Sequence, residues 1–382
     1  MELSILTFVL VLLLAFANGA NDVSKAISTL VGSGVTDYRS AILWGTCWTV
    51  IGAGLSGVLA TAMVKIFSQG LLASDAAASP ALAPAVLIAA VLWVLVASWT
   101  GLPVSTTHAL IGAIVGTGLV AFGSEGLVWT GIGKKIVLPL LLSPMLALTV
   151  AVLVHRLIRT LAARWEGTCL CIMPTAKALV MVDAHGRTRT LFQSTGMGQP
   201  VVAVPAQCDR AGLNGLTIGL DSIHWVSSGF ASLARGMNDA PKIAAILLLG
   251  NATALWPNNG LQSTALIGVA VAMGVGSYLA GDRVTQVLAE KVTRMDHSEG
   301  LSANLATSSL VFVSAMMGLP VSTTHVSSSA IIGIGLLKGV HAVRWAMVRH
   351  MVLAWIVTLP SAAVLAGVAY FLITKLLNHI SN

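Results

Sequence analysis

Long apolar stretches alternate along most of the chain with short segments that contain glycine, proline or charged residues. A helix rises 1.5 Å per residue, so about 20 apolar residues span the hydrocarbon core of a bilayer. The pattern therefore predicts an all-α polytopic membrane protein with about 10–12 membrane segments. The expected helices, some of them half-spans of broken or hinged pairs, cover residues 3–17, 22–33, 40–66, 84–101, 105–122, 131–157, 221–235, 238–250, 263–281, 301–318, 322–338 and 344–376.

The composition excludes an ordinary soluble protein. Hydrophobic residues make up 56% of the 382 residues, charged residues only 9%, and the mean hydropathy is +0.88. A soluble protein uses roughly 25% charged residues to cover its surface. The net charge of +7 is carried mainly by a few clusters between apolar runs, which indicates membrane topology rather than nucleic-acid binding. We therefore expect the lipid bilayer, and no nucleic acid, as a partner.

Two motifs occur twice at one spacing. Residues 17–26 have the sequence ANGANDVSKA and residues 234–243 the sequence ARGMNDAPKI, whereas GLPVSTTH occurs identically at 101–108 and 318–325. Each second copy lies 217 residues after the first. Separated motifs that keep one register indicate two copies of a structural unit. The expected domains are a first transmembrane repeat (1–159), an insert (160–218) and a second transmembrane repeat (219–382).

The second repeat is predicted to be inverted relative to the first. Each copy crosses the membrane an odd number of times if its hinged pair returns to its starting side, which is the inverted-repeat design of many secondary transporters. Most cations then fall on one side, which the positive-inside rule assigns to the cytoplasm, leaving both termini outside. These cations are Arg39, Arg156, Arg159, Arg164, Arg283, Lys291, Arg294, Lys338 and Arg344. The exceptions are Lys65, Lys134, Lys135 and Lys375.

The insert at residues 160–218 interrupts the apolar pattern. It contains short runs that are typical of strands, such as 178–182 and 201–204, with a turn at 183–186. We expect a small β-rich cytoplasmic insert that tethers the two halves, with a regulatory role as the alternative.

The first motif places ionisable residues inside apolar segments. Its members are Asn21, Asp22 and Lys25 in the first half and Asn238, Asp239 and Lys242 in the second. Ionisable groups at membrane depth are costly and usually mark a substrate or ion path. Mutual neutralisation of Asp22 and Lys25, one helical turn apart, is the simpler alternative. Gly19 and Gly236 precede the motifs and predict a helix break at each, whose freed backbone groups could bind a ligand.

The second motif predicts an anion site. Pro103 and Pro320 suit the entry to a helix rather than its middle. The residues that follow, Ser105, Thr106 and Thr107 and their counterparts Ser322, Thr323 and Thr324, would occupy the cap and first turn of a helix. A helix N-terminus offers unpaired N–H groups and partial positive charge. Two such termini could hold one tetrahedral oxyanion; ordinary helix capping is the alternative.

Together, the paired G-x-N-D and P-V-S-T-T-H motifs resemble those of the inorganic phosphate transporter (PiT) family. The resemblance covers the chain except the insert. It implies an inverted-repeat symporter that imports phosphate with Na⁺ or H⁺, requires no cofactor and has no catalytic residues. It also implies that the motif asparagines, aspartates and Ser-Thr-Thr runs line the central site, and some relatives carry sulfate instead.

The coupling ion is left open between H⁺ and Na⁺. The candidate coupling residues are Asn21, Asp22, His108, Asn238, Asp239 and His325, and Na⁺ could bind at the asparagines and aspartates. Many family members have N-D-V-A-N-A where this chain has lysine at the fifth position, Lys25 and Lys242. A fixed ammonium at these positions favours H⁺ coupling over Na⁺ coupling.

Inorganic phosphate is the expected substrate. Phosphate can donate a hydrogen bond to Asp22 or Asp239, whereas sulfate has no proton to donate; the argument weakens if the carboxylates face a cation. A sulfate or metal–phosphate permease on the same fold is the nearest alternative.

A channel would need a continuous polar lining, and an enzyme acting on phosphate esters would need a nucleophile or metal site that the motifs lack. No Walker A motif appears. A homodimer is also expected.

Overall fold

The computed structural model describes residues 2–73, 79–162, 169–173, 176–182, 188–194, 199–203, 217–249 and 261–381. The first half contains α1 (Glu2–Asp22), α2 (Ser24–Gly32), α3 (Tyr38–Leu59), α4 (Thr61–Gln69), α5 (Leu82–Thr100), α6 (Thr106–Phe122), the short η2 (Ser124–Gly126) and α7 (Trp129–Gly131), the π-helix η3 (Ile132–Val137) and α8 (Leu138–Ala162). The second half contains α10 (Leu220–Ala245), α11 (Leu261–Ala280), α12 (Asp282–Glu290), α13 (His297–Met316), α14 (Thr323–Leu337), η5 (Val340–Ala342) and α15 (Trp345–Ser381).

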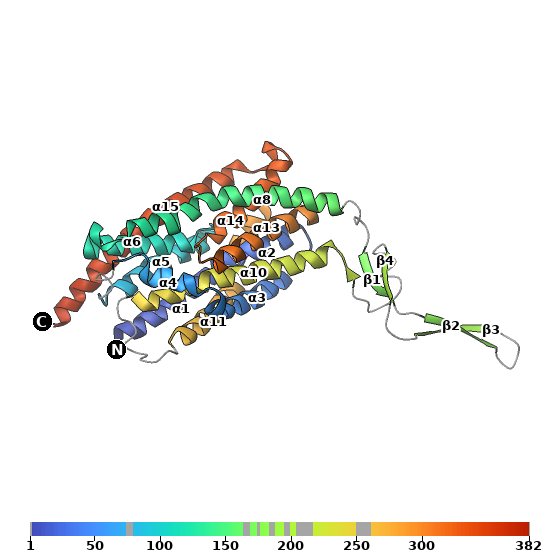
Figure 1. Cartoon of the computed structure of the whole chain (residues 1–382), viewed down its shortest axis with the longest axis horizontal. Coiled ribbons are helices and arrows are strands. Elements are labelled where there is room, and N and C mark those ends of the chain that lie inside the picture. The colour runs from blue at the N-terminus through green and yellow to red at the C-terminus, as the bar shows by residue number, and fades with distance from the viewer. Residues whose placement is uncertain are drawn as a thin grey trace.

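The helices form one elongated body, and the segment between α8 and α10 projects from one end of it (Figure 1). Five strands lie in that segment: β1 (Cys169–Met173), β2 (Ala176–Val182), β3 (Thr188–Ser194), β4 (Gln199–Ala203) and β5 (Thr217–Ile218). Strand β1 pairs antiparallel with β4 and β5, and β2 pairs antiparallel with β3. Both chain termini lie at the opposite end of the body (Figure 1).

The two halves pack with matching partners. Helix α1 packs against α11 in the way that α10 packs against α3. Likewise, α6 packs against α15, and α14 packs against α8. The first half runs from the end with the termini to the end with the strands, and the second half runs back (Figure 1). Helix α1 therefore runs away from the end with the termini, and α10 runs towards it (Figure 1).

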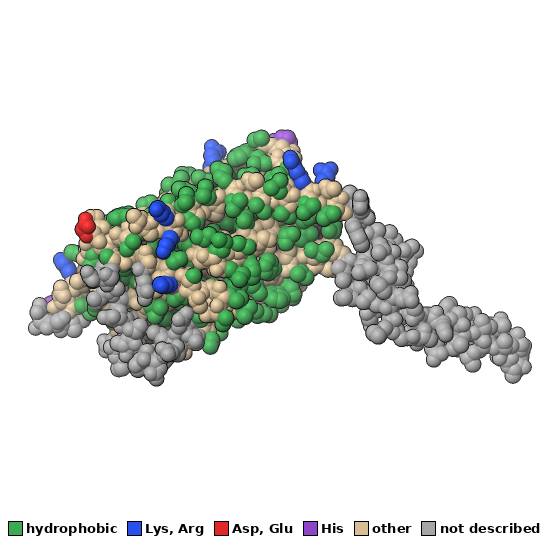
Figure 2. All heavy atoms as spheres, in the orientation of Figure 1, with side chains coloured by type: hydrophobic (Ala, Val, Ile, Leu, Met, Phe, Trp, Pro, Cys, Tyr) green, Lys and Arg blue, Asp and Glu red, His purple; other side chains and the backbone are tan. Residues whose placement is uncertain are grey.

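The body has the surface of a membrane protein. Hydrophobic side chains cover much of the visible face, whereas lysine and arginine side chains are few and scattered on it (Figure 2). In the described residues, five helices are long and apolar enough to cross a bilayer, and the bent α11–α12 pair makes a sixth. Helices α6 and α14 are apolar but shorter. The prediction of about 10–12 segments stays a prediction, because it also counts short, bent and more polar helices.

The predicted helix breaks at the two motif glycines are wrong. Helix α1 continues through Gly19 to Asp22, and α10 continues through Gly236 to Ala245. A Cβ atom on Gly19 would lie 2.1 Å from the Met273 carbonyl oxygen of α11, and one on Gly236 would lie 2.4 Å from the Thr49 carbonyl oxygen of α3. Glycine at these positions therefore allows close helix packing rather than a break.

The predicted hinges before the Ser-Thr-Thr runs are confirmed. Helix α5 ends at Thr100 and is capped by Gly101, which has a left-handed φ of 75°, and Gly318 after α13 has a φ of 67°. Ser105 and Ser322 then adopt extended backbone conformations and cap α6 and α14. This geometry places the N-termini of both short helices inside the body. A 66° bend between α11 and α12 at Gly281 was not predicted.

Candidate functional site

The N-termini of α6 and α14 lie next to each other and are tied together by reciprocal hydrogen bonds. The Thr324 hydroxyl donates to the Val104 carbonyl oxygen at 2.6 Å. In the equivalent bond, the Thr107 hydroxyl donates to the Val321 carbonyl oxygen at 3.4 Å. Each helix thus bonds the extended segment that precedes the other. The two termini, with their partial positive charges, meet at one place between the halves.

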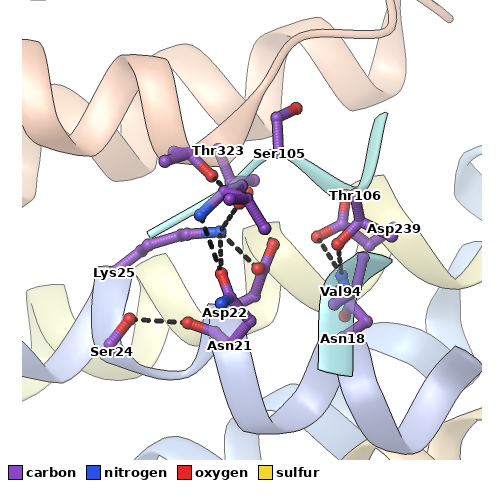
Figure 3. A network of polar contacts seen from close by, with 12 residues as sticks. Asn18, Asn21, Asp22, Ser24, Lys25, Val94, Ser105, Thr106, Asp239 and Thr323 are labelled. Carbon is purple, nitrogen blue, oxygen red and sulfur yellow. Dashed lines mark hydrogen bonds and ion pairs between the residues drawn. The ribbon is translucent and has the colours of Figure 1, made fainter. Parts of the chain in front are cut away.

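The first ion pair lies beside this junction. The Lys25 ammonium donates to the Asp22 carboxylate, to the Asn21 side-chain oxygen at 3.4 Å and to the Val104 carbonyl oxygen at 3.1 Å (Figure 3). Thr323, from the other half, donates its hydroxyl to the second Asp22 oxygen at 3.0 Å. One carboxylate therefore joins α1, the start of α2 and the N-terminus of α14.

The second ion pair repeats the arrangement on the other side. The Lys242 ammonium contacts Asp239 Oδ1 at 3.2 Å, Thr107 Oγ1 at 2.9 Å and the Val321 carbonyl oxygen at 3.1 Å. Asn238 donates to Asp239 at 2.8 Å and to the Val321 carbonyl oxygen at 3.3 Å. Lys25 and Lys242 thus contact equivalent carbonyls, 217 residues apart in the sequence.

Asn18 joins the two halves and was not predicted from the sequence. Its amide donates to Thr106 Oγ1 at 3.0 Å and to Asp239 Oδ2 at 3.4 Å (Figure 3). It lies one turn before Asp22 on α1, so helical spacing could have placed it on the same face. Residues from α1, α6 and α10 therefore meet at this one side chain.

The whole cluster is shielded from solvent. The four charged residues of the ion pairs expose 2% or less of their surface, and the neighbouring asparagines and threonines are buried as well. Burying an ion pair gains little stability over packing apolar residues in the same space. Ionisable groups at membrane depth are usually retained for a substrate or ion path. Mutual neutralisation, the simpler alternative, describes the contacts of each pair but not their position at two helix N-termini.

A fifth charged residue, Arg235, was also missed in the sequence. It is only 2% exposed and is among the largest fully buried side chains of the described residues. Its position corresponds to Asn18 at the shared spacing of 217 residues. Asn18 lies at the site, so a cation at the position equivalent to Asn18 is the signal that could have revealed Arg235. The guanidinium donates to Thr49 at 2.6 Å and to Ser277 at 3.2 Å.

The remaining predicted residues, two serines and two histidines, do not contact the ion pairs in the same way as the threonines. The hydroxyls of Ser105 and Ser322 accept the backbone N–H groups of His108 and His325, each at 3.2 Å, so the serines cap the helices. The two histidine rings lie 4.6 Å apart between centroids, and His325 also lies 4.1 Å from the Trp355 ring. No hydrogen bond among the described residues joins either ring to the ion pairs. The two histidines and Trp355 therefore form a cluster that is separate from the ion pairs.

The lysine ammoniums occupy sets of oxygen atoms that would suit a hard cation. Carboxylate, amide and backbone carbonyl oxygens surround the Lys25 ammonium, and carboxylate, hydroxyl and carbonyl oxygens surround that of Lys242. Such oxygens are the preferred ligands of hard cations. Among the described residues, no group of three or more histidine, cysteine, aspartate or glutamate side chains could hold a metal ion.

Comparison with known proteins identifies the family of this chain. The sequence profile described as "Phosphate transporter family" matches residues 18–366, a range that contains both copies of both motifs except Ala17. The chain belongs to the phosphate transporter family. The family resemblance that the motifs indicated is therefore confirmed, and the chain is a multi-pass membrane protein.

Two curated family relatives and one solved structure extend the match. A Thermococcus kodakarensis protein named "Putative phosphate permease" is 30% identical over 93% of this chain and 93% of its own length. The "Probable low-affinity inorganic phosphate transporter" of Mycobacterium tuberculosis is 29% identical over 98% of this chain and 78% of its own. A structure titled "The sodium-dependent phosphate transporter" is 21% identical, covers 98% of this chain and 100% of its own, and has a TM-score of 0.77, so the fold is shared.

Proposed function

We propose that this member of the phosphate transporter family is a secondary active transporter that imports inorganic phosphate across the cytoplasmic membrane. The observation that carries the proposal is the junction of the α6 and α14 N-termini, each bonded to the segment preceding the other. Helix N-termini are ready anion sites. The threonines of both termini lie there with Asn21, Asp22, Asn238 and Asp239, and the oxyanion would bind among them.

The proposed architecture is a pair of inverted repeats, residues 1–159 and 219–382, joined by the insert at 160–218. The matching helix contacts and the opposite directions of the two halves support it (Figure 1). Alternating access would follow from rocking of one repeat against the other around a fixed central site. The insert would then lie in the cytoplasm and the termini outside.

We further propose that H⁺ rather than Na⁺ drives uptake. Each lysine ammonium already fills an oxygen-rich position that a mobile cation would otherwise need. The fixed charges of Lys25 and Lys242 would attract the anion without a metal ion. His108 and His325, whose ring centroids lie 4.6 Å apart, remain the candidate proton carriers. Na⁺ coupling is the alternative.

A sulfate permease on the same fold is the second candidate. Asp22 and Asp239 both face an ammonium group, so neither carboxylate depends on a proton donated by the substrate. The preference for phosphate that rests on such a proton is weakened accordingly. Competition would separate the candidates, because arsenate should block a phosphate site, whereas molybdate or selenate should block a sulfate site.

The deciding experiment is uptake of radiolabelled phosphate and sulfate into proteoliposomes, with Na⁺ and pH gradients imposed separately. We expect saturable phosphate uptake that follows the pH gradient and persists without Na⁺. Empty liposomes and the double variant Asp22→Asn/Asp239→Asn are the controls. Strict dependence on a Na⁺ gradient at constant pH would remove the proposed H⁺ coupling. Normal uptake by the double variant would show that the site lies elsewhere.

A further inference from the structure

The guanidinium of Arg235 has hydrogen-bonding capacity that the protein does not use. Only its Nη2 donates, to Thr49 on α3 and Ser277 on α11. In the described residues, Nε and Nη1 have no hydrogen-bond partner although both are buried. A buried charged group with unsatisfied donors is costly and is normally retained only where another group satisfies it.

Arg235 lies within electrostatic range of the ion pairs. Both aspartates, Asp22 and Asp239, interact with its charge, although neither contacts it directly. It precedes Asp239 by one turn on α10, as Asn18 precedes Asp22 on α1. Asn18 reaches the N-terminus of α6 through Thr106. The equivalent reach of Arg235 would be towards Thr323 at the N-terminus of α14.

The buried cluster has an unbalanced positive charge. Lys25, Lys242 and Arg235 provide three cations, whereas Asp22 and Asp239 provide two carboxylates. One positive charge therefore has no partner within the cluster. The partial positive charges of two helix N-termini add to this excess. A bound anion with one negative charge would balance the cluster.

We infer that Arg235 is an oxyanion-binding residue, which bonds the substrate through a free guanidinium donor and whose charge fits the site to a monoanion such as dihydrogen phosphate. The inference rests on the proposed phosphate site. Guanidinium groups bind phosphate oxygens through charge-assisted hydrogen bonds, and a single such bond already places the cation against the anion. Neither contact to Thr49 or Ser277 needs to break, because Nε and Nη1 are the donors that remain.

The test compares phosphate binding to the purified full chain and three variants. Arg235→Gln removes the charge, Arg235→Lys keeps the charge without the planar fork, and Arg156→Gln is a control at an exposed arginine of α8. Radiolabelled phosphate binding and the phosphate-induced rise in Tm are measured at mildly acidic pH, where phosphate carries one negative charge. We expect about 10- to 100-fold weaker binding for Arg235→Gln, the range expected from losing hydrogen bonds to a charged group. Arg235→Lys should be intermediate, and Arg156→Gln unchanged.

A purely structural role would give a different result. If Arg235 only joins α3 to α11, Arg235→Gln should lower the Tm without phosphate but keep the same phosphate-induced rise, and this outcome would overturn the inference. If Arg235→Gln does not fold, phosphate binding by Arg235→Lys equal to wild type overturns it instead. Tighter binding of sulfate than phosphate by the wild type would overturn the match to a monoanion. Wild-type protein that binds no phosphate would overturn the proposed function as well.

Discussion

A buried ion pair is fragile to the loss of one partner. Asp22 and Lys25 expose no more than 2% of their surface, so Asp22→Asn leaves a buried ammonium without its carboxylate. We expect this variant to lose uptake and to lower the free energy of unfolding by about 3–5 kcal/mol. The double variant Asp22→Asn/Lys25→Met should regain much of that stability but not uptake. Unfolding in detergent and proteoliposome uptake provide the two measurements.

The control for these variants is Lys65→Met, which changes an exposed lysine of α4. It should leave both uptake and stability close to wild type, because exposed charges contribute little. An Asp22→Asn protein as stable as wild type would contradict the assignment of a buried, charged pair.

Thr107 offers a second comparison at the scale of one residue. Its hydroxyl accepts from the Lys242 ammonium at 2.9 Å, whereas Thr117 on the same helix has a buried hydroxyl without a partner among the described residues. Thr107→Ala should reduce phosphate uptake at least about tenfold, because it removes a charge-assisted hydrogen bond at the site. Thr117→Ala, about 15 Å further along the helix, should leave uptake within about twofold. Equal effects of the two substitutions would mean that hydroxyl loss acts on α6 packing alone.

Sequence reasoning proposed the candidate site residues that recur in both halves and missed the buried neighbours that differ. Asp22 and Asp239 repeat at the same spacing, so the repeat itself drew attention to them. Asn18 and Arg235 occupy equivalent positions but have different side chains, so no shared motif marked them. Which donors remain unsatisfied depends on neighbours from α3 and α11, and the sequence does not give those contacts.

At the scale of helices, small residues decide how closely the elements approach. A Cβ atom on Gly52 of α3 would lie 2.1 Å from the Leu233 carbonyl oxygen of α10, whereas one on Gly54 would meet nothing within 4 Å. Gly52→Ala should therefore lower the free energy of unfolding by about 1–3 kcal/mol through overpacking. Gly54→Ala should be neutral or stabilise by up to about 1 kcal/mol, because alanine favours the helix. Detergent unfolding curves of the two variants provide the measurement, and equal stabilities would contradict the close contact.

The same physics explains which elements the sequence predicted. The hinge at Gly101 was predictable because glycine at position 101 and proline at position 103 together disfavour a continuous helix. The breaks expected at Gly19 and Gly236 were wrong because glycine serves equally for a break and for a close helix contact. The choice between these two roles depends on whether a neighbouring backbone approaches. That information lies in α11 for the first glycine and in α3 for the second.

At the scale of the whole molecule, the two ends of the helical body carry different sets of lysine and arginine residues. Arg156 and Arg159 lie near the end of α8, which leads to the strands, whereas Lys375 lies in α15 near the terminus at the other end (Figure 1). Loops on the cytoplasmic side are enriched in lysine and arginine. Most of the loop cations are predicted to lie on the same side of the membrane as the insert. The end of the body that leads to the insert should therefore face the cytoplasm. The count favours this orientation, although four lysines oppose it.

This orientation and the inverted repeats make one joint prediction about topology. Alkaline phosphatase is active only outside the cytoplasm, so a fusion after residue 382 should be active in a bacterial host, and a fusion that replaces everything after residue 165 should be inactive. A fluorescent protein that matures only in the cytoplasm should give the reverse pattern at the same two positions. In inverted repeats each half crosses the membrane an odd number of times, and an odd number of crossings in residues 219–382 requires the two positions to lie on opposite sides. Both fusions on one side would therefore rule out inverted repeats, whereas opposite sides with the reverse assignment would keep the repeats and reject only the orientation inferred from the cations.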